Sequence, residues 1–303
     1  MTHHLASQAT SAEKDMANVL VTGASKGIGL ATALAFARAG HRVAAGMRNP
    51  AQAPELGEIA ARENLNVSIE TMDVDDDSSV NRAIERVVQA IGPVAVLVNN
   101  AGIERVGAIE DVSMDDVRAV METNYFGAVR CIKAVVPAMR ERRNGCIVNV
   151  TSISGRLSGS PMGPYAASKF ALEALSESLA QEVKPFNVRV AIVEPGIIDT
   201  SMAARISTDA HGSRYPNRNR MAALFRSSLQ HPTAPSQVAD RIVEIATGDT
   251  AQLRHPVGPD AAPFIAWRQA MSDEAWVAWG ALDDDAWYAA VQADFGLDAR
   301  PGS

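Results

Sequence analysis

Residues 18–40 read NVLVTGASKGIGLATALAFARAG and decide the fold class. The continuous apolar run at 18–22 predicts a strand buried on both faces. A glycine-rich turn follows, and the alanine-rich segment from about 27 to 39 predicts a helix. Glycines between a strand and a helix allow the backbone to approach a pyrophosphate closely at the helix N-terminus. The stretch therefore predicts a phosphate-binding β–turn–α unit, although its G-x-x-x-G-x-G spacing differs from the G-x-G-x-x-G dinucleotide fingerprint.

Downstream of this unit, short apolar runs alternate with helical patterns. Strands are expected at 41–47, 67–70, 94–98, 146–150, 188–193 and 253–258, and helices at 78–91, 114–140 with a bend near Pro137, 164–184 and 237–246. Alternating strands and helices with near-continuous apolar strands predict a parallel sheet covered on both faces. Because crossovers are right-handed, we expect an α/β fold, a Rossmann-like doubly wound parallel sheet of about seven strands.

The chain ends differ in character from the repeating part. Residues 1–17 contain no apolar core, so they predict a flexible arm and not a signal peptide. Residues 18–258 are expected to form a single Rossmann-type domain, with an excursion at 200–235 that is rich in Arg, Ser and Asn. A helical extension at 259–303 holds all four tryptophans of the chain, Trp267, Trp276, Trp279 and Trp287. They either pack this extension onto the body or form a lid or subunit contact.

The composition indicates a soluble globular protein. The chain has 303 residues, of which 47% are hydrophobic and 21% charged, and its net charge is −7. This charge argues against nucleic acid or an anionic membrane surface as partner. Cys131 and Cys146 are expected to be buried small apolar residues, since two cysteines form no disulfide framework. No apolar run reaches the length of a membrane span, so we expect a cytoplasmic protein without a metal site.

The stretch 149–169, NVTSISGRLSGSPMGPYAASK, carries Ser152, Tyr165 and Lys169. Pro164 suits the first turn of a helix, and residues four apart share a helix face, so Tyr165 and Lys169 point the same way. A phenol needs its pKa lowered by roughly 2–3 units to transfer protons near neutrality. One positive charge about 4 Å away supplies roughly that effect at an effective dielectric of ~20. Taken alone, Y-x-x-x-K is equally an ordinary exposed helix face.

Polar residues follow the predicted strands at the carboxyl edge, where open α/β sheets bind ligands. Asn99-Asn100-Ala101-Gly102 follows the fourth strand, and Pro195-Gly196 ends the sixth. Asp73 ends the third strand, whereas 75–77 are expected to begin the next helix. The second strand ends in Met47-Arg48 without a carboxylate, and Lys26 stands in the glycine turn. Cations in place of an acid favour a 2′-phosphate, and thus NADP over NAD.

Taken together, these motifs resemble those of a short-chain dehydrogenase/reductase of the compact type, over about 18–258. The matching elements, in family order, are TGASKGIG, the Asp73-Val74 pair, NNAG, Asn124 in TNYFG, Ser152, YAASK and PGIIDT. The MRN that ends the second strand and the VEPG before Thr200 resemble the ketosteroid- and retinal-reducing branches. The N-terminal arm and the extension beyond about 260 depart from the family pattern.

This resemblance implies a role for each matching residue. Tyr165 would be the general acid or base, Lys169 would lower its pKa and hold the nicotinamide ribose, and Ser152 would bind the substrate oxygen. Asn124 would hold a water in the proton relay. The implied cofactor contacts are Gly23, Ser25, Lys26, Gly27, Ile28, Gly29, Arg48, Asp73, Val74, Asn100, Ala101, Gly102, Tyr165, Lys169, Pro195, Gly196, Ile198 and Thr200.

The expected function is that of an NADP(H)-dependent oxidoreductase that interconverts a secondary alcohol and a ketone on an apolar substrate such as a steroid or retinoid. The resemblance also implies a homo-oligomer, a dimer or tetramer, built through the helices at 114–140 and 164–184. An alternative is an NADP(H)-binding sensor without turnover, but such proteins usually lack one of the catalytic groups. A third hypothesis, lyase or epimerase chemistry, is disfavoured by the TGASKGIG spacing and the chain length.

Overall fold

A single seven-stranded parallel sheet organises the protein. The computed structural model describes residues 16–208 and 213–300, so most of the expected N-terminal arm lies outside the described residues. The strand order is β3-β2-β1-β4-β5-β6-β7, and each neighbouring pair is parallel. The strands are β1 Asn18–Thr22, β2 Arg42–Met47, β3 Val67–Thr71, β4 Val96–Asn99, β5 Gly145–Val150, β6 Val188–Pro195 and β7 Arg254–Val257. The order reverses between β1 and β4, which is where doubly wound sheets bind ligands.

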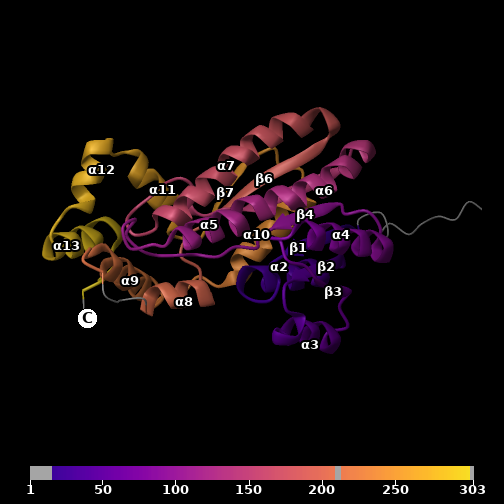
Figure 1. Cartoon of the computed structure of the whole chain (residues 1–303), viewed down its shortest axis with the longest axis horizontal. Helices are drawn as coiled ribbons and strands as arrows, with labels where there is room; N and C mark the ends of the chain where they lie inside the picture. Colours follow the sequence, from indigo (N-terminus) through magenta and orange to yellow (C-terminus); the bar gives the residue numbers. More distant parts are fainter. Residues whose placement is uncertain (1–15, 209–212, 301–303) are drawn as a thin grey trace, which may run out of the picture.

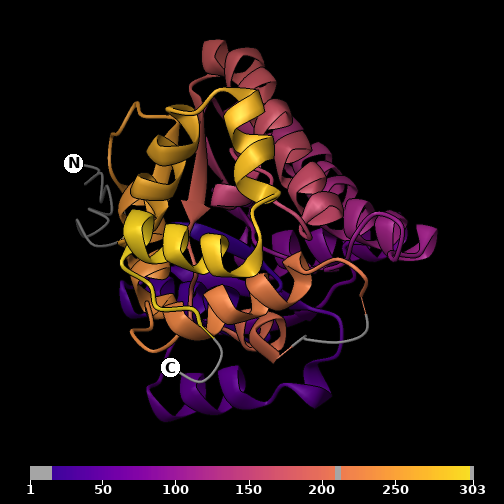
Figure 2. The same ribbon diagram turned by 90° about the vertical axis from the view of Figure 1, so that its left-hand side faces the viewer.

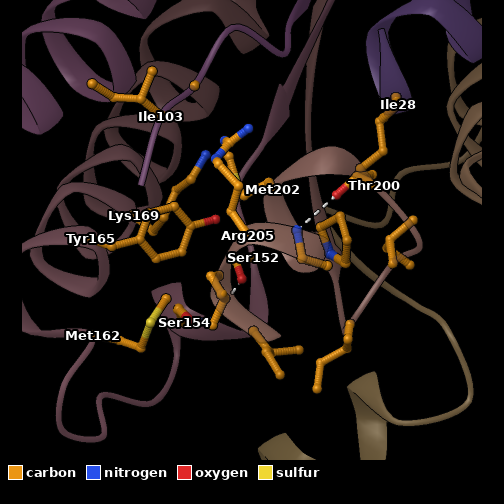
Figure 3. A pocket seen from close by; sticks show the side chains of 18 of the residues that line it. Ile28, Ile103, Ser152, Ser154, Met162, Tyr165, Lys169, Thr200, Met202 and Arg205 are labelled. Atoms are coloured by element: carbon orange, nitrogen blue, oxygen red, sulfur yellow. Dashed lines mark hydrogen bonds between the residues drawn. The ribbon is translucent and has the colours of Figure 1, made fainter. Parts of the chain in front are cut away.

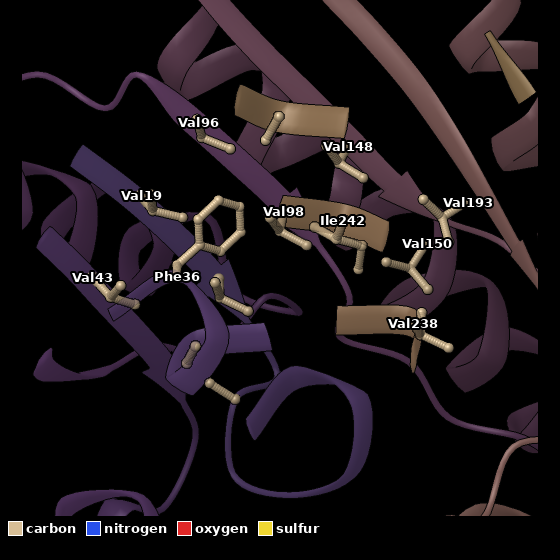
Figure 4. Packing of buried hydrophobic residues seen from close by; sticks show 14 of the residues in the cluster. Val19, Phe36, Val43, Val96, Val98, Val148, Val150, Val193, Val238 and Ile242 are labelled. Carbon is tan, nitrogen blue, oxygen red and sulfur yellow. The ribbon is translucent and has the colours of Figure 1, made fainter. Parts of the chain in front are cut away.

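Helices cover both faces of this sheet (Figure 1). One face packs against α2 Gly27–Arg38, α3 Glu55–Arg62 and α10 Pro235–Thr247, and the other against α4 Asp77–Ile91, α6 Gly127–Arg142 and α7 Gly163–Val183. Because side chains alternate along a strand, Val19 and Val21 join the first core while Leu20 joins the second. Figure 4 shows the first core, in which Phe36 of α2 and Ile242 of α10 meet the strand valines. The predicted fold class is confirmed.

The long helix expected over 114–140 is interrupted in the structure. It consists of α5 (Met114–Met121), a π-helical segment η2 (Glu122–Phe126) and α6. The irregular segment therefore lies at η2, and α6 continues to Arg142 with Pro137 inside it. A π turn adds one residue to the helix and frequently marks a functional site. Cys131 and Cys146 are free and buried, as expected.

Five further helices gather at one end of the molecule, shown in orange and yellow in Figures 1 and 2. They are α8 Ser201–Thr208, α9 Asn217–Ser228, α11 Ala261–Gln269, α12 Asp273–Gly280 and α13 Asp284–Phe295. Trp287, Tyr288 and Val291 of α13 pack with Leu224 of α9 and with Ile197 in a separate apolar cluster. Among the described residues, no helix is long and apolar enough to cross a membrane.

Candidate active site

A cavity of about 1160 Å³ opens along the carboxyl edge of the sheet. It is lined by the segments that follow β1, β2, β3, β4, β5 and β6, and by the helices at the C-terminal end. With two exceptions, every site residue predicted from the sequence lines this cavity. The exceptions are Asn124, which lies behind it, and Asn99, which is buried and donates to the Asn149 side chain. Figure 3 shows the part of the cavity that contains Ser152, Tyr165 and Lys169.

The glycine turn after β1 has the geometry that a pyrophosphate requires. Gly23 has a φ of +67°, and a Cβ on Gly29 would lie 2.3 Å from the carbonyl oxygen of Gly23. Helix α2 begins directly after the turn with neither a side-chain cap nor an acidic residue in its first turn. Its first N–H groups and its dipole are therefore available to an anion. The described residues of this turn fit the pyrophosphate of a dinucleotide.

Hydrogen bonds join this turn to the loop after β4. The Thr22 hydroxyl oxygen accepts from the backbone N–H groups of Asn100 and Ala101, each at 3.0 Å. The Asn100 side chain donates in return to the carbonyl oxygens of Thr22 at 2.9 Å and Gly23 at 3.2 Å. The two loops at the switch point thus form one rigid unit. Sequence reasoning quoted Thr22 within the motif but missed its structural role.

The far end of the cavity carries the two predicted cations and a carboxylate. Lys26 and Arg48 are both exposed and line the cavity together with Asp73. Of the acids expected to begin the next helix, Asp76 does cap it by accepting from the Ser79 N–H. Asp75 differs: it lines the cavity, accepts from the Thr123 hydroxyl at 3.0 Å, and burial raises its pKa. The expectation for Asp75 was wrong because the helix begins at Asp77 with Asp76 as its cap, which leaves Asp75 ahead of the helix and in contact with Thr123.

The predicted proton-transfer residues come together at the ends of β5 and α7. Ser152 follows β5, and Tyr165 lies in the first turn of α7 just after Pro164. Lys169 is one turn further along, with its Nζ 5.7 Å from the Tyr165 ring centroid and 3.0 Å from the Val150 carbonyl oxygen. In Figure 3 the Tyr165 phenol points towards Ser152, with the Lys169 side chain beside the ring. The helix spacing thus brings the three groups into one site.

The electrostatics of this site differ from the expectation that Lys169 lowers the pKa of Tyr165. Burial raises the pKa of the Tyr165 phenol to about 12, while a hydrogen bond with Ser152 lowers it and the charge of Glu104 raises it. Burial lowers the pKa of Lys169 to about 8, opposed by the Glu173 carboxylate. The side chains are enclosed, so desolvation outweighs the pair interaction. A phenol with this pKa keeps its proton at physiological pH, and it is a weaker acid than proton transfer near neutrality requires.

Asn124 lies in the π-helical segment, behind Lys169. It is 1% exposed, and its amide oxygen accepts from the Ile103 N–H at 2.8 Å. Its amide nitrogen donates to the Ile103 carbonyl at 2.9 Å and to the Ser168 hydroxyl at 2.9 Å. A Cβ on Gly102 would lie 3.3 Å from the Asn124 amide oxygen and 3.7 Å from Lys169 Nζ. The side chain therefore fixes the loop after β4 next to the lysine.

Sequence reasoning missed a buried carboxylate that supports the catalytic helix. Glu173, one turn beyond Lys169, is 4% exposed. It accepts from the Thr151 hydroxyl at 2.6 Å and from Arg254 Nε at 2.9 Å. A Cβ on Gly155 would lie 2.9 Å from its Cγ, so the turn after Ser152 packs directly on it. The available signal was an acid four residues after the lysine on the same helix face.

Sequence reasoning also missed an ion pair that joins the loop after β4 to helix α8. Arg205 Nη2 donates to both carboxylate oxygens of Glu104, at 2.8 and 3.1 Å. Arg205 also lines the cavity, whereas Glu104 is 7% exposed. The two residues are 101 positions apart in the sequence, so no local pattern predicts their contact. The pair holds the 200–235 excursion against the catalytic region.

A glycine turn at the switch point of a parallel sheet, next to a helix that presents a tyrosine and a lysine, defines a Rossmann-type oxidoreductase that uses a nicotinamide cofactor. The family model described as short chain dehydrogenase matches residues 17–211. The chain belongs to the short-chain dehydrogenase/reductase family.

Relatives with similar sequences cover most of the chain. An uncharacterized oxidoreductase, YusZ of Bacillus subtilis, is 38% identical over 267 residues, which are 85% of this chain and 94% of that protein. A 3-ketodihydrosphingosine reductase of Bacteroides thetaiotaomicron is 40% identical over 80% of this chain and 87% of its own. Retinol dehydrogenase 8 of Bos taurus is 36% identical over 82% of this chain and 83% of its own. The family thus includes reductases and dehydrogenases with different substrates.

Solved structures share the same fold. A short-chain dehydrogenase from Streptomyces avermitilis has a TM-score of 0.74 at 33% identity, covering 87% of this chain and 96% of that one. A Burkholderia phymatum family member in complex with NAD has a TM-score of 0.74 at 22% identity, covering 84% and 93%. An alcohol dehydrogenase from Thermococcus sibiricus complexed with 5-hydroxy-NADP has a TM-score of 0.65 at 24% identity, covering 80% and 94%. The two complexes therefore contain different nicotinamide dinucleotides.

Proposed function

We propose that this protein is an NADP(H)-dependent oxidoreductase that interconverts a secondary alcohol and a ketone, with Tyr165 as general acid and base. The observation that carries the proposal is the common site of Ser152, Tyr165 and Lys169 in the cavity that also holds the glycine turn. A phosphate-binding turn at one end and a proton-transfer group at the other is the arrangement that hydride transfer needs. The names of the relatives, which include a ketone reductase and a retinol dehydrogenase, support the same reaction class.

In the reduction direction, a reduced nicotinamide dinucleotide held by the glycine turn would supply the hydride for the carbonyl carbon. Ser152 and Tyr165 donate hydrogen bonds to the carbonyl oxygen and so polarise it. As the hydride adds, the Tyr165 phenol gives its proton to that oxygen and becomes a phenolate. The Lys169 ammonium would stabilise the phenolate, and it is the residue that would hold the ribose hydroxyls of the cofactor. Asn124 fixes the loop after β4 so that the lysine stays in place.

The proposed preference for NADP(H) concerns the adenosine end of the cavity. Lys26 and Arg48 line that end, and both are exposed and free to reorient towards a 2′-phosphate. The position after β2 where NAD-binding enzymes carry an acid holds Arg48. Asp75 lines the same region, but the Thr123 hydroxyl already donates to one of its oxygens. Because Asp73 and Asp75 also line the cavity, the proposed preference rests on the position of Arg48 after β2 and not on the net charge of this end.

The decisive test is Tyr165→Phe, assayed by nicotinamide absorbance with NADPH and NADH over a panel of ketones. The substitution removes only the hydroxyl, so turnover is expected to fall by about 10²–10⁴-fold, while NADPH affinity by calorimetry stays near wild type. Tyr215→Phe is the matched control, because this tyrosine is 41% exposed. Unchanged turnover in the Tyr165 variant would refute the mechanism, and NADPH binding without turnover in wild type would favour a cofactor sensor.

We further propose that 18–258 acts as one catalytic domain, that 259–303 extends it, and that the chain forms a homo-oligomer, a dimer or tetramer. Large apolar side chains are exposed on the two neighbouring helices that the resemblance assigns to subunit contacts: Met114 at 60%, Phe126 at 45% and Phe170 at 43%. Contiguous exposed apolar surface is typical of subunit interfaces, and these three side chains are the ones to test. Light scattering after size exclusion should give a multiple of the chain mass, and Phe170→Glu should reduce it. A monomeric wild-type protein would contradict this proposal.

A further inference from the structure

The turn between β6 and α8, residues 195–200, forms a central part of the cavity wall. On one side it adjoins the glycine turn, since a Cβ on Gly27 would lie 3.3 Å from Thr200 Cγ2. On the other side it adjoins the reaction centre, because β6 pairs with β5, which leads directly to Ser152. A dinucleotide with its pyrophosphate at the glycine turn and its hydride directed at Tyr165 must therefore place its nicotinamide against the β6–α8 turn.

The backbone of this turn is supported from the side away from the cavity. The Gly196 N–H donates to the Val257 carbonyl oxygen at 2.9 Å. The next N–H, that of Ile197, donates to a side chain, the Oδ2 of Asp260, at 2.7 Å. Neither Val257 nor Asp260 belongs to the cavity lining. One carboxylate thus completes the support that the end of the sheet begins.

Helix capping does not account for this carboxylate. Asp260 stands at the N-cap of α11, where an aspartate normally accepts from the first N–H groups of its own helix. Its side chain makes no such bond. Asp283, at the N-cap of α13, does accept from the Ala286 N–H, at 2.8 Å. The Asp260 carboxylate is directed instead at Ile197, a residue 63 positions earlier in the chain.

The carboxylate occupies a space that two glycines leave open. A Cβ on Gly196 would lie 2.1 Å from Asp260 Oδ1, and the three atoms nearest to it all belong to this carboxylate. A Cβ on Gly258, whose φ is +107°, would lie 2.8 Å from the same oxygen. Among the described residues Oδ1 has no hydrogen-bond partner, and burial raises the pKa of Asp260. Enclosure of a carboxylate costs free energy, and the bond from Ile197 offsets part of that cost.

We propose that Asp260 is a positioning residue for the nicotinamide half of the cofactor. By fixing the Ile197 backbone, it keeps the β6–α8 turn where the nicotinamide of a bound dinucleotide must lie. Because Asp260 lies outside the cavity lining, it acts through the turn and not by contact with the cofactor. This inference rests on the dinucleotide binding within the proposed function, and it does not depend on the alcohol–ketone reaction.

The test compares two ligands by calorimetry: NADPH, and 2′-phospho-ADP-ribose, which lacks the nicotinamide. Asp260→Ala leaves the Ile197 N–H without its acceptor, so NADPH affinity should fall about tenfold, the size of one charge-assisted hydrogen bond. Affinity for the fragment should stay at the wild-type value, since the glycine turn is unchanged. Asp260→Asn should bind both ligands like wild type, because its amide oxygen still accepts. Equal losses for both ligands, or unchanged NADPH affinity in Asp260→Ala, would overturn the proposal.

Asp283→Ala is the matched control. It also removes an aspartate from a helix N-cap in the extension, but this carboxylate caps α13 and does not support the turn. The melting temperature should fall, and both affinities should stay at the wild-type values. A selective loss of NADPH affinity in this control would contradict the assignment to Asp260.

Gly196→Ala tests the same contact from the other side, and it serves if Asp260→Ala does not fold. Its Cβ would displace the Asp260 carboxylate, so NADPH affinity should fall while affinity for the fragment does not. In the Asp260→Ala background the same substitution should add little, because the atoms that the Cβ would meet are absent. Fully additive losses would refute the link between Asp260 and the turn.

The positioning role and the proposed reaction fail separately. If Tyr165→Phe retains turnover while Asp260→Ala loses NADPH affinity selectively, the positioning role stands and the proposed mechanism is refuted. If Tyr165→Phe loses turnover while Asp260→Ala binds both ligands like wild type, the mechanism stands and the positioning role is refuted. The same comparison with NADH and ADP-ribose makes the result independent of the proposed preference for NADP(H).

Discussion

The glycine turn after β1 and helix α12 line the same cavity but are built in opposite ways. The turn is fixed by its backbone: Gly23 has a positive φ, and Asn100 donates to two of the turn's carbonyls. Helix α12 contributes side chains and buries none of its residues. A cofactor common to a whole family can be bound by fixed backbone geometry. Substrate choice instead depends on side chains that need no fixed motif.

The largest effect on cofactor binding is expected from Gly29→Ala, which changes the rigid glycine turn. Its Cβ would meet the Gly23 carbonyl oxygen at 2.3 Å and the Asn100 side chain at 2.4 Å. Relief of this clash must move the turn, so the free energy of unfolding should fall by about 1–3 kcal/mol and NADPH affinity by roughly 100-fold. Thermal melting and calorimetric titration measure both quantities.

Gly280→Ala is the matched substitution at the end of helix α12. A Cβ on Gly280 would meet nothing within 4 Å, and alanine is the better helix former. Stability and NADPH affinity should therefore stay at or slightly above wild type. A large loss in this variant, or none in Gly29→Ala, would contradict the contrast between a rigid turn and a tolerant extension.

The next largest effect is expected on NADPH binding at the adenosine end of the cavity. Lys26→Ala and Arg48→Ala should each weaken NADPH binding by about tenfold, because each removes one charge-assisted contact to the 2′-phosphate. NADH affinity should hardly change, and it serves as the internal control. Equal losses for both dinucleotides would mean that these cations do not recognise the phosphate.

A smaller effect is expected on the pH dependence at the catalytic centre. Lys169, with a pKa lowered to about 8, loses its charge as the pH rises through that value, so kcat/KM for ketone reduction should fall above about pH 8. Tyr165, with a pKa raised to about 12, stays protonated over this range. Alcohol oxidation needs the phenolate and should therefore accelerate with pH. Parallel pH profiles in the two directions would contradict this assignment.

The smallest effect is expected from Glu173→Gln. The Glu173 carboxylate raises the pKa of Lys169, so its neutralisation should move the alkaline decline of ketone reduction to lower pH. A merely structural role would reduce kcat without moving that decline. Glu177→Gln is the control, since this half-exposed acid contacts Arg254 from outside. The pH at half-maximal kcat/KM is the quantity to compare.

The sequence predicted the sheet, its helices and the gathering of Ser152, Tyr165 and Lys169, because these follow from hydrophobic periodicity and from i,i+4 spacing. It did not predict the high pKa of Tyr165, since both the burial of the phenol and the nearby charge of Glu104 depend on elements that are distant in the chain. The contact between Glu104 and Arg205 likewise joins residues 101 positions apart. Long-range burial and pairing leave no local pattern in the chain.

The tryptophans illustrate the same limit. Their sequence positions left open whether they pack the extension or line a lid. The structure gives both answers: Trp287 is buried and Trp279 packs against the same apolar cluster, while Trp276, Trp279 and Trp287 all line the cavity. Residue type alone does not separate these cases, because aromatic side chains suit cores and binding surfaces equally.

The π-helical segment η2 rotates helix α6 about the helix axis relative to helix α5. One additional residue in a turn rotates everything beyond it by about 100° relative to a regular helix. Helix α5 packs against α7 and helix α6 against α4 and the sheet, so each helix keeps its own buried face only with this offset between them. Deletion of one residue within 122–126 would restore a regular helix, at the expense of either the α6 core or the orientation of Asn124. Chain length at this point is therefore constrained independently of which residues fill it.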